Sequence, residues 1–405
     1  MGNNSSLRVL LAWDFGADLG HLARLRPLAQ SLEARGHEVF FAVRDFSRID
    51  ALPASMRVMP APMVSVSAVE GKIREAATFA DILYNAGAAD ARLLGGLVRG
   101  WRNLFELVRP DVVVQDYSPF SQIALQGLDI ARVNVGTGFV CPPNISPLPD
   151  IRPWEDHYPE RLQQTEAEVT ETVNRQLALQ GEAPLLGLGE LYQRTDANLL
   201  GTFAELDHYP QRAAVLDGRT RYCGIWSDLQ GVAPDWPAVD GPRVFAYLKP
   251  FRGLPRLLDH MQCSGCTVLA YLAGDFDVHR WQGENMRIVS TPLDMEQARH
   301  QCDMAVLHSG HGSTANLLLA GKPILQLPAH VEQNLTAINT ERLGAGVSAN
   351  LGNADAIREA FDRVATDPSI AAAAHAFAAK YAGFNQEQAL QAAVEEIEVI
   401  ARAKK

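Results

Sequence analysis

Length, composition and charge narrow the choice of function before any motif is considered. The chain has 405 residues, of which 47% are hydrophobic and 20% charged, as in ordinary globular proteins. That length predicts two domains rather than one core. The net charge of −11 argues against nucleic acid as a partner, because phosphate neutralisation needs clustered Lys and Arg. The sequence has no apolar run as long as the ~20 residues that a membrane span needs, and it has no signal-peptide pattern. Both observations favour a cytoplasmic protein.

The first elements along the chain predict a βαβ unit. Residues 7–13 form a continuous apolar run that is typical of a parallel strand covered on both faces. A glycine-punctuated loop over 14–21 follows, then a helix over 22–35 and a strand over 37–43. The loop after the first strand lies where open α/β sheets bind ligands. His21 ends this loop, where an imidazole could act as a base, whereas His37 is expected to be structural.

A base at His21 needs a carboxylate partner. An amphipathic helix over 93–108 precedes a strand over 112–114, and Asp116 follows that strand at its carboxyl end. A carboxylate at this place could fix the imidazole tautomer and stabilise the imidazolium. Asp14 and Asp18, in the same loop as His21, are alternative partners.

The middle of the chain carries the expected domain boundary. A long proline-rich loop over 137–154, with Met63, Phe79 and Tyr84, is the candidate lining of an apolar cleft for a ligand. Residues 231–242 are rich in Pro and Gly without periodicity, which indicates a linker. The expected domains are therefore 1–230 and 243–385, followed by a helix over 386–405 that returns to the first domain.

The second domain contains the strongest ligand signal. Strands are expected over 243–248 and 267–272, with a helix over 254–261 between them. A strand over 304–307 then runs into the glycine-rich turn 308–314, with the sequence HSGHGST, followed by a helix and a strand over 324–327. Small residues let backbone N–H groups approach a ligand at the positive end of the helix dipole. The turn therefore predicts an anion site, and a diphosphate fits it.

The metal motifs in this half are weak. Asp275 and Asp277 form an Asp-x-Asp, but the turn at 308–314 already supplies the charge neutralisation that a metal would give. Cys263 and Cys266 form a C-x-x-C that no second ligand pair follows, and the chain's five scattered cysteines fit reduced thiols. We expect no metal.

The two glycine-rich segments resemble the signatures of the UDP-glycosyltransferase superfamily, whose members have the two-domain GT-B fold. The family's donor signature has a His, a Ser or Thr five residues on, a Gly-x-Pro, and an Asp/Glu-Gln pair after a further Pro. The matching residues, at the family's spacing, are His308, Ser313, Gly321, Pro323, Pro328, Glu332 and Gln333. The segment 20–42, GHLARLRPLAQSLEARGHEVFFA, resembles the family's N-terminal signature, in which the His is the general base.

The resemblance implies an α/β protein of two Rossmann-like domains that face each other across a cleft. It implies inverting transfer of a hexose from a UDP- or dTDP-sugar to a hydroxyl of a small, apolar acceptor, with no cofactor beyond this co-substrate. His21 would be the base and Asp116 its orienting partner, while Glu332 and Gln333 would bind the donor sugar. The donor diphosphate would be bound by His308, Gly310, Gly312, Ser313 and Thr314.

Departures from the family leave alternatives open. Asn316 stands where plant-type members carry the Glu that binds the ribose, so the nucleotide is undecided. A non-catalytic relative that binds a partner or a nucleotide sugar is one rival, and the paired His21 and Asp116 speak against it. A sugar-nucleotide epimerase of the same fold is another, although it would use carboxylate bases near the sugar.

Overall fold

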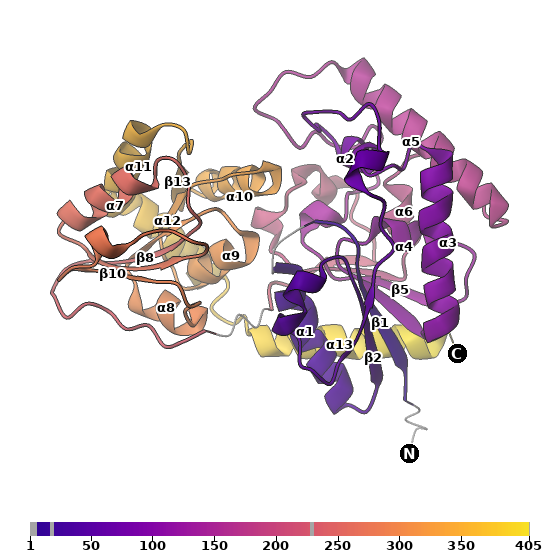
Figure 1. Ribbon diagram of the computed structural model, residues 1–405, viewed down its shortest axis with the longest axis horizontal. Helices are drawn as coiled ribbons and strands as arrows, with labels where there is room; N and C mark the ends of the chain where they lie inside the picture. The colour runs from indigo at the N-terminus through magenta and orange to yellow at the C-terminus, as the bar shows by residue number, and fades with distance from the viewer. Residues whose placement is uncertain (1–5, 17–19, 227–230, 405) are drawn as a thin grey trace. The chain divides into compact units, whose positions relative to one another are not determined.

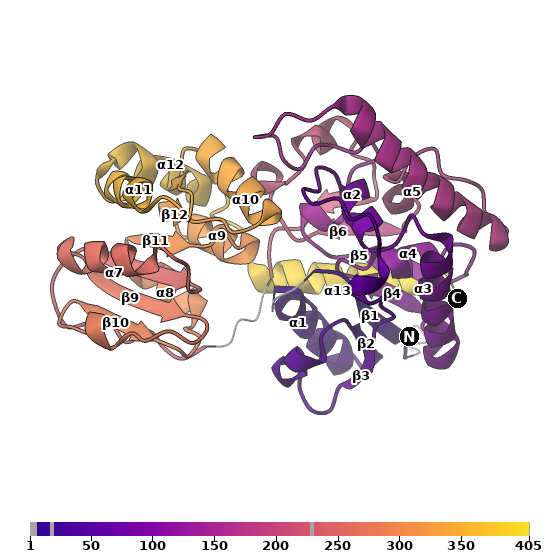
Figure 2. The same cartoon turned by 45° about the horizontal axis from the view of Figure 1, so that its top comes forward.

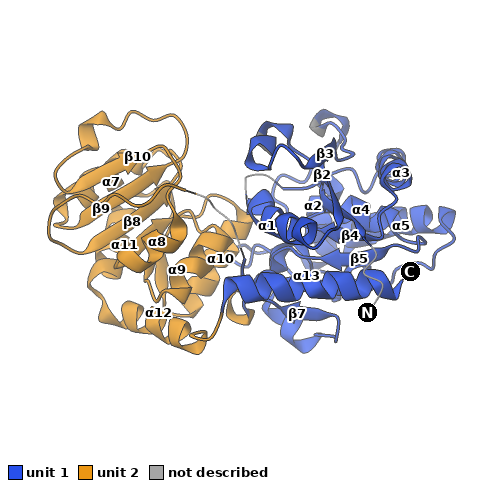
Figure 3. Cartoon of the chain, turned by 90° about the horizontal axis from the view of Figure 1, so that it is seen from below, with its two compact units in different colours: residues 1–203, 209–228, 385–405 blue, residues 204–208, 229–384 orange. Residues whose placement is uncertain are grey.

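The computed structural model describes residues 6–16, 20–226 and 231–404, which form two compact units. Unit 1 consists of Met1–Phe203, Tyr209–Asp228 and Asn385–Lys405, and unit 2 of Ala204–His208 and Leu229–Phe384 (Figure 3). Each unit has its own parallel sheet and its own core, so each is described separately.

Unit 1 is built on a seven-stranded parallel sheet in the order β3-β2-β1-β4-β5-β6-β7. Figure 1 labels β1, β2 and β5 of this sheet. Its strands are β1 (Arg8–Trp13), β2 (Glu38–Val43), β3 (Arg57–Pro60), β4 (Val112–Gln115), β5 (Ala131–Asn134), β6 (Ala197–Leu200) and β7 (Thr220–Tyr222). Its α-helices are α1 (Gly20–Ala34), α2 (Phe79–Asn85), α3 (Ala91–Val108), α4 (Pro119–Ala124), α5 (Pro159–Leu179), α6 (Glu190–Gln193) and α13 (Gln386–Ala403).

Helices cover both faces of this sheet, which explains its unbroken apolar strands. One face packs against the apolar stripes of α1 and of α13, the last helix of the chain. α13 is fixed there by polar contacts as well: Nε2 of the buried His37, just before β2, lies 2.6 Å from Oε1 of Glu398, and Arg35 donates to the same carboxylate at 3.0 Å. His37 is therefore structural, as the sequence indicated.

Unit 2 has a six-stranded parallel sheet in the order β10-β9-β8-β11-β12-β13. Figure 2 labels β9, β10, β11 and β12 of this sheet. Its strands are β8 (Arg243–Leu248), β9 (Thr267–Leu272), β10 (Met286–Val289), β11 (Met304–Leu307), β12 (Ile324–Gln326) and β13 (Gly346–Ser348). Its α-helices are α7 (Leu254–Cys263), α8 (Met295–Gln301), α9 (His311–Leu319), α10 (Val331–Arg342), α11 (Ala354–Thr366) and α12 (Pro368–Lys380). Apolar residues of α7 and α11 pack on one face of this sheet to form the core.

The α/β class with two parallel sheets is confirmed, but two helices begin earlier than the sequence pattern predicts. α1 begins at Gly20, which puts His21 on its first turn rather than in the loop. α9 begins at His311, directly after Gly310, so that most of the glycine-rich turn is helical. In both cases small or polar residues start the helix before its apolar periodicity begins, and periodicity alone does not register them.

Residues 204–208 are the unexpected part of the division into units. The sequence assigns them to the first domain, yet they group with unit 2. Asp207 O accepts a hydrogen bond from Asn339 Nδ2 of α10 at 2.8 Å, and Glu205 accepts one from Tyr381 Oη, just after α12, at 2.6 Å.

Within the described residues, no helix has both the length and the apolar character that a membrane crossing requires.

Candidate active site

Both sets of candidate residues lie where the strand order of a sheet reverses. In unit 1 the reversal falls between β1 and β4, and the segments after these strands carry His21 and Asp116. In unit 2 it falls between β8 and β11, and the turn at 308–314 follows β11. Open α/β sheets bind ligands at such reversals, beyond the carboxyl ends of the strands. The topology thus supports one half-site in each unit.

The half-site of unit 1 is a hydrogen-bonded histidine and aspartate. His21 Nδ1 lies 3.1 Å from Asp116 Oδ1, and the Asp116 side chain is fully buried. The indole of Trp13 stacks on the imidazole, with ring centroids 5.3 Å apart. An Nδ1–H that donates to the carboxylate leaves the lone pair on Nε2. Gly16 borders that nitrogen so closely that a Cβ there would lie 2.7 Å from it.

A second cation shares the carboxylate of Asp116. Arg24, one turn after His21 on α1, donates from Nη1 to Asp116 Oδ2 at 2.5 Å. Burial raises the pKa of Asp116, but the charges and hydrogen bonds of Arg24 and His21 outweigh it, so this pKa is lowered overall. The sequence did not single out Arg24, although its spacing of three residues from His21 on a helix was a usable signal.

Asp14 is not the partner of His21. Its Oδ2 instead accepts hydrogen bonds from Trp101 Nε1 at 3.0 Å and from Ser121 N at 3.3 Å. Burial raises the pKa of this carboxyl to about 7, against hydrogen bonds that lower it. Asp18, the other alternative, lies outside the described residues. The arrangement therefore favours Asp116 over Asp14 as the group that orients the imidazole.

Aromatic side chains surround the imidazole in unit 1. The ring of Tyr117 lies 5.9 Å from that of His21, and Phe15 and Phe79 lie 5.0 and 6.0 Å from Tyr117. Phe79 was expected to line an acceptor cleft, but it is buried, whereas Met63 is half exposed. The half-site is therefore apolar on the side of Tyr117.

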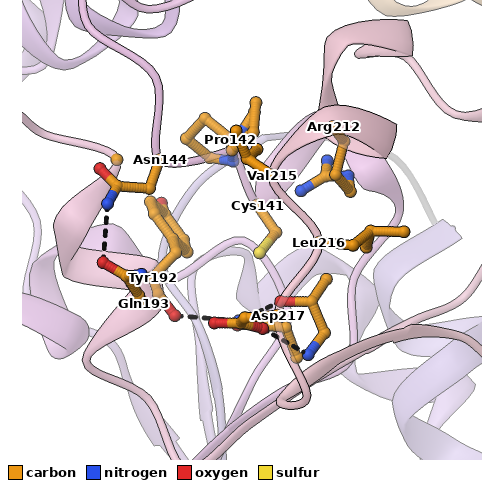
Figure 4. Close-up of a pocket in the computed structure, with 13 residues that line it drawn as sticks. Cys141, Pro142, Asn144, Tyr192, Gln193, Arg212, Val215, Leu216 and Asp217 are labelled. Atoms are coloured by element: carbon orange, nitrogen blue, oxygen red, sulfur yellow. Dashed lines mark hydrogen bonds between the residues drawn. The ribbon is translucent and has the colours of Figure 1, made fainter.

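The loop over 137–154 contributes to a small, open pocket in unit 1, with a cavity volume of about 30 Å³ (Figure 4). Cys141, Pro142, Pro143 and Asn144 line one part of it, and Tyr192, Gln193, Asn198 and Arg212 line others. Its wall is held by polar contacts, such as that of Asn144 Nδ2 with Gln193 Oε1 at 2.6 Å. Residues 141–144, which belong to the loop expected to line an apolar cleft, thus line a pocket.

The half-site of unit 2 is the N-terminus of α9. Gly310 precedes the first helical residue, and a Cβ added at Gly310 or Gly312 would meet no atom within 4 Å. The backbone there is open to a ligand, at the end of a helix that favours an anion. Ser313 lies on the same first turn. Thr314 points inward: its N–H donates to Gly310 O at 2.9 Å, and its hydroxyl accepts from Gln326 at 3.2 Å.

His308 stands at the entrance to this turn with its ring held by backbone carbonyls. Nδ1 lies 2.7 Å from Leu327 O, and Nε2 lies 3.2 Å from Lys249 O. The ring also packs edge-on against Phe251. Contact of Nε2 with a bound anion would require it to exchange the Lys249 carbonyl for the ligand. The next residue, Ser309, has a positive φ of 57°, which turns the chain sharply into α9.

Glu332 and Gln333 lie on the first turn of α10, after the neighbouring strand β12. The side chain of Gln333 accepts a hydrogen bond from Ala329 N at 2.8 Å, which fixes the loop before the helix. Asn316, at the place of the family's ribose-binding Glu, donates from Nδ2 to Gly312 O at 3.0 Å. Because β11 and β12 are adjacent and parallel, the acid-amide pair and the α9 turn follow the same edge of the sheet.

His208 is a neighbour of this half-site that the sequence did not reveal. Its Nε2 lies 3.2 Å from Thr336 Oγ1 on α10, and its ring lies 5.1 Å from the ring of His311 at the start of α9. Nearly 100 residues separate it from the turn in the chain, so no local pattern connects them. Among the described residues, no three His, Cys, Asp or Glu side chains gather as a metal site would need.

Comparison with known proteins agrees with this architecture. No family model matches the sequence. A glycosyltransferase of PGL/p-HBAD biosynthesis from Mycobacterium tuberculosis is 25% identical over 402 residues, which cover 91% of this chain and 89% of the relative. The structure of CalG4, the calicheamicin glycosyltransferase, aligns with a TM-score of 0.71 at 15% identity over 98% of both chains. The glycosyltransferase VinC, in complex with dTDP, aligns with a TM-score of 0.67 at 18% identity over 98% of this chain and all of the other.

The fold is therefore that of the GT-B glycosyltransferases, and the expected resemblance is confirmed. The mycobacterial relative is itself named a glycosyltransferase.

Proposed function

We propose that the protein is an inverting glycosyltransferase that moves a hexose from a UDP- or dTDP-sugar to a hydroxyl of a small, apolar acceptor without a metal ion. The observation that carries the proposal is the His21–Asp116 pair, with its 3.1 Å contact at the strand reversal of unit 1. Support for the donor comes from the open N-terminus of α9 and from the dTDP complex of the similar VinC. Support for the acceptor comes from two similar proteins, one named the calicheamicin glycosyltransferase and the other a glycosyltransferase of PGL/p-HBAD biosynthesis.

In the proposed mechanism His21 takes the proton of the acceptor hydroxyl on Nε2 while that oxygen attacks the anomeric carbon. Asp116 holds the ring through Nδ1 and stabilises the imidazolium that forms. The bond from the anomeric carbon to the diphosphate oxygen breaks, and the leaving diphosphate gains negative charge. Attack from the face opposite the leaving group inverts the anomeric configuration.

The unit 2 half-site would stabilise the leaving group. Backbone N–H groups on the first turn of α9, the Ser313 hydroxyl and the His308 ring would donate to the diphosphate, where preorganised donors lower the barrier most. Glu332 and Gln333 on α10 would hydrogen-bond the sugar hydroxyls and select the donor. These two roles need no proton transfer, so they are separable from that of His21.

The test starts from a thermal-shift screen of UDP-, dTDP- and GDP-sugars, followed by acceptor arrays with the best donor. We expect His21→Ala to lower transfer by about 10²- to 10⁴-fold, the usual contribution of a general base, and to leave donor affinity within about twofold of the unsubstituted protein. His300→Ala is the control, because that exposed histidine lies on α8 and contacts Glu296. NMR of the product should show the inverted anomer. Loss of donor affinity in His21→Ala, or transfer that persists in it, would contradict the role of base.

A further inference from the structure

Arg24 closes a chain of three side chains that begins at His21. Asp116 Oδ1 lies 3.1 Å from His21 Nδ1, and Asp116 Oδ2 accepts a hydrogen bond from Arg24 Nη1 at 2.5 Å. The side chains of His21 and Arg24 are each 13% exposed, and that of Asp116 is fully buried. Among the described residues, these two supply the hydrogen bonds to the carboxylate. The carboxylate is thus shared between an imidazole and a permanent cation.

We propose that Arg24 is a positioning residue that offsets the charge of Asp116, so that the carboxylate orients the imidazole of His21 without holding a proton on it. The inference rests on the proposed function, because it assigns a purpose to Arg24 only if His21 acts as a base. A carboxylate alone beside an imidazole favours the protonated ring, which cannot accept a proton. A guanidinium on its other oxygen lowers that preference and still permits the orienting hydrogen bond.

Burial makes this arrangement effective. Charges in a site with little water interact several times more strongly than in bulk solvent, so one added cation changes the proton equilibrium of its neighbour. A lone buried carboxylate would also be costly, and Arg24 makes its charge tolerable in the interior. The lowered pKa of Asp116 accords with this, since Arg24 contributes the largest of the effects that lower it.

The guanidinium is held in place by unit 1 itself. Trp226 Nε1 donates to the backbone oxygen of Arg24 at 3.3 Å, which fixes that turn of α1. A Cβ at Gly201 would lie 3.1 Å from Arg24 Nε, so the segment after β6 packs directly against the side chain. The hydrogen bond from Trp226 and the packing against Gly201 therefore fix the position of Arg24.

Other charged or titratable groups near His21 have partners of their own. Asp14, after β1, is bonded to Trp101 and Ser121. Arg44, after β2, donates to the backbone oxygen of Asp14 at 3.3 Å and lies over the ring of Phe15. Tyr117, after β4, faces the imidazole with its ring. None of these contacts reaches the carboxylate of Asp116, so the charge balance at that group is set by His21 and Arg24.

The experiment compares the pH dependence of transfer in the unsubstituted protein, Arg24→Gln, Arg24→Lys and Arg26→Gln. Arg24→Gln keeps a donor but removes the charge, whereas Arg24→Lys keeps the charge. Arg26→Gln is the matched control, because Arg26 is on the same helix but donates to Ala51 O at 2.9 Å. We expect the acid limb of the profile to move up by about one pH unit in Arg24→Gln, so that transfer on that limb falls about tenfold and recovers at high pH. Arg24→Lys and Arg26→Gln should keep the original midpoint.

A second readout separates this inference from the proposed function. The NMR titration of the His21 ring, assigned by its loss in His21→Gln, is measured on the ligand-free protein and needs no substrate. The ring should remain protonated to higher pH in Arg24→Gln, by the same shift as the acid limb. Equal loss of rate at every pH, with an unmoved titration, would overturn the role of Arg24 and leave the glycosyltransferase proposal intact. If the unsubstituted protein transfers no sugar from any donor but the His21 titration still shifts in Arg24→Gln, the glycosyltransferase proposal is overturned. The effect of Arg24 on the imidazole then stands. If Arg24→Gln does not fold, Arg24→Met tests the same loss of charge.

Discussion

At the scale of single residues, two aspartates near one histidine have opposite environments. Asp116 is paired with two cationic or proton-donating side chains, and its pKa is lowered. Asp14 accepts hydrogen bonds from an indole and a backbone N–H, and burial outweighs these and the charge of Arg44, so that its pKa is raised to about 7. Burial alone thus does not decide the charge of a carboxyl group; the partner does. The role proposed in unit 1, orienting the base, is therefore assigned to Asp116 and not to Asp14.

Asp14 should therefore make stability depend on pH. Its unfolded pKa is near 3.8 and its folded pKa about 7, so between these values the folded protein holds a proton that the unfolded chain releases. Stability from this group is complete below the unfolded pKa and falls as pH rises toward 7, by at most about 1.4 kcal/mol per pH unit. Asp14→Asn removes the titration. We expect the difference in unfolding free energy, Asp14 protein minus variant, to fall between pH 5 and 7 and then level off.

Urea denaturation at half-unit intervals of pH measures this difference. The control is Asp355→Asn, because the Asp355 side chain is 76% exposed at the surface of α11. Its difference from the unsubstituted protein should be flat over the same range. A flat difference for Asp14→Asn would show that this carboxyl is ionised in the folded protein at pH 5.

The residues that sequence reasoning found and missed differ in how far apart they lie in the chain. The position of His21 and Asp116 at one edge of the sheet was predictable, because each follows a strand and the strand ends of a parallel sheet meet at one edge. Arg24 was harder to find, because α1 carries two arginines, at positions 24 and 26; the spacing of three residues from His21 favours Arg24, but only packing shows that it faces the carboxylate. His208 was out of reach, since its neighbours lie on α9 and α10 through a tertiary contact that no spacing encodes.

At the scale of elements, the first turn of α9 is where local stability and proposed function conflict. Gly312 is helical, and glycine weakens a helix relative to alanine by about 0.5–1 kcal/mol. Nothing in the structure requires it, because a Cβ at this place would meet no atom within 4 Å. The open space is instead what an anion would need to reach the N–H groups of the turn. The proposed donor site would account for a glycine at this position.

Gly312→Ala should accordingly stabilise the protein and weaken the donor. We expect a gain of about 0.5 kcal/mol in unfolding free energy. Affinity for the nucleotide sugar should fall about tenfold or more, as expected when hydrogen bonds to a charged group are lost. Gly96→Ala is the control, because Gly96 lies in α3 of unit 1 and also has open space at its Cβ. It should stabilise the protein equally and leave affinity unchanged. Unchanged donor affinity in Gly312→Ala would place the diphosphate elsewhere.

At the scale of the whole molecule, an acidic chain is proposed to bind an acidic co-substrate. The net charge of −11 opposes the approach of a diphosphate, so attraction has to come from local groups. A protein can attract a diphosphate locally in two ways: with a bound divalent cation, or with oriented dipoles at a helix N-terminus. The open N-terminus of α9 offers the second, with His308 and Ser313 beside it. Asp277, the candidate of the Asp-x-Asp, accepts a hydrogen bond from the backbone of His279 at 3.1 Å, as a turn residue does.

Transfer should therefore proceed without a divalent ion. We expect the rate with the best donor to be the same within error in buffer treated with a chelating resin, in millimolar EDTA, and after addition of Mg²⁺ or Mn²⁺. Salt provides the matching arm: because dipoles and buried donors are screened less than surface charges, donor affinity should change little between low and physiological ionic strength. A rate that vanishes in EDTA and returns with one metal would mean that the diphosphate charge is neutralised by a cation, and would move the donor site from the α9 turn to whichever carboxylates hold that ion.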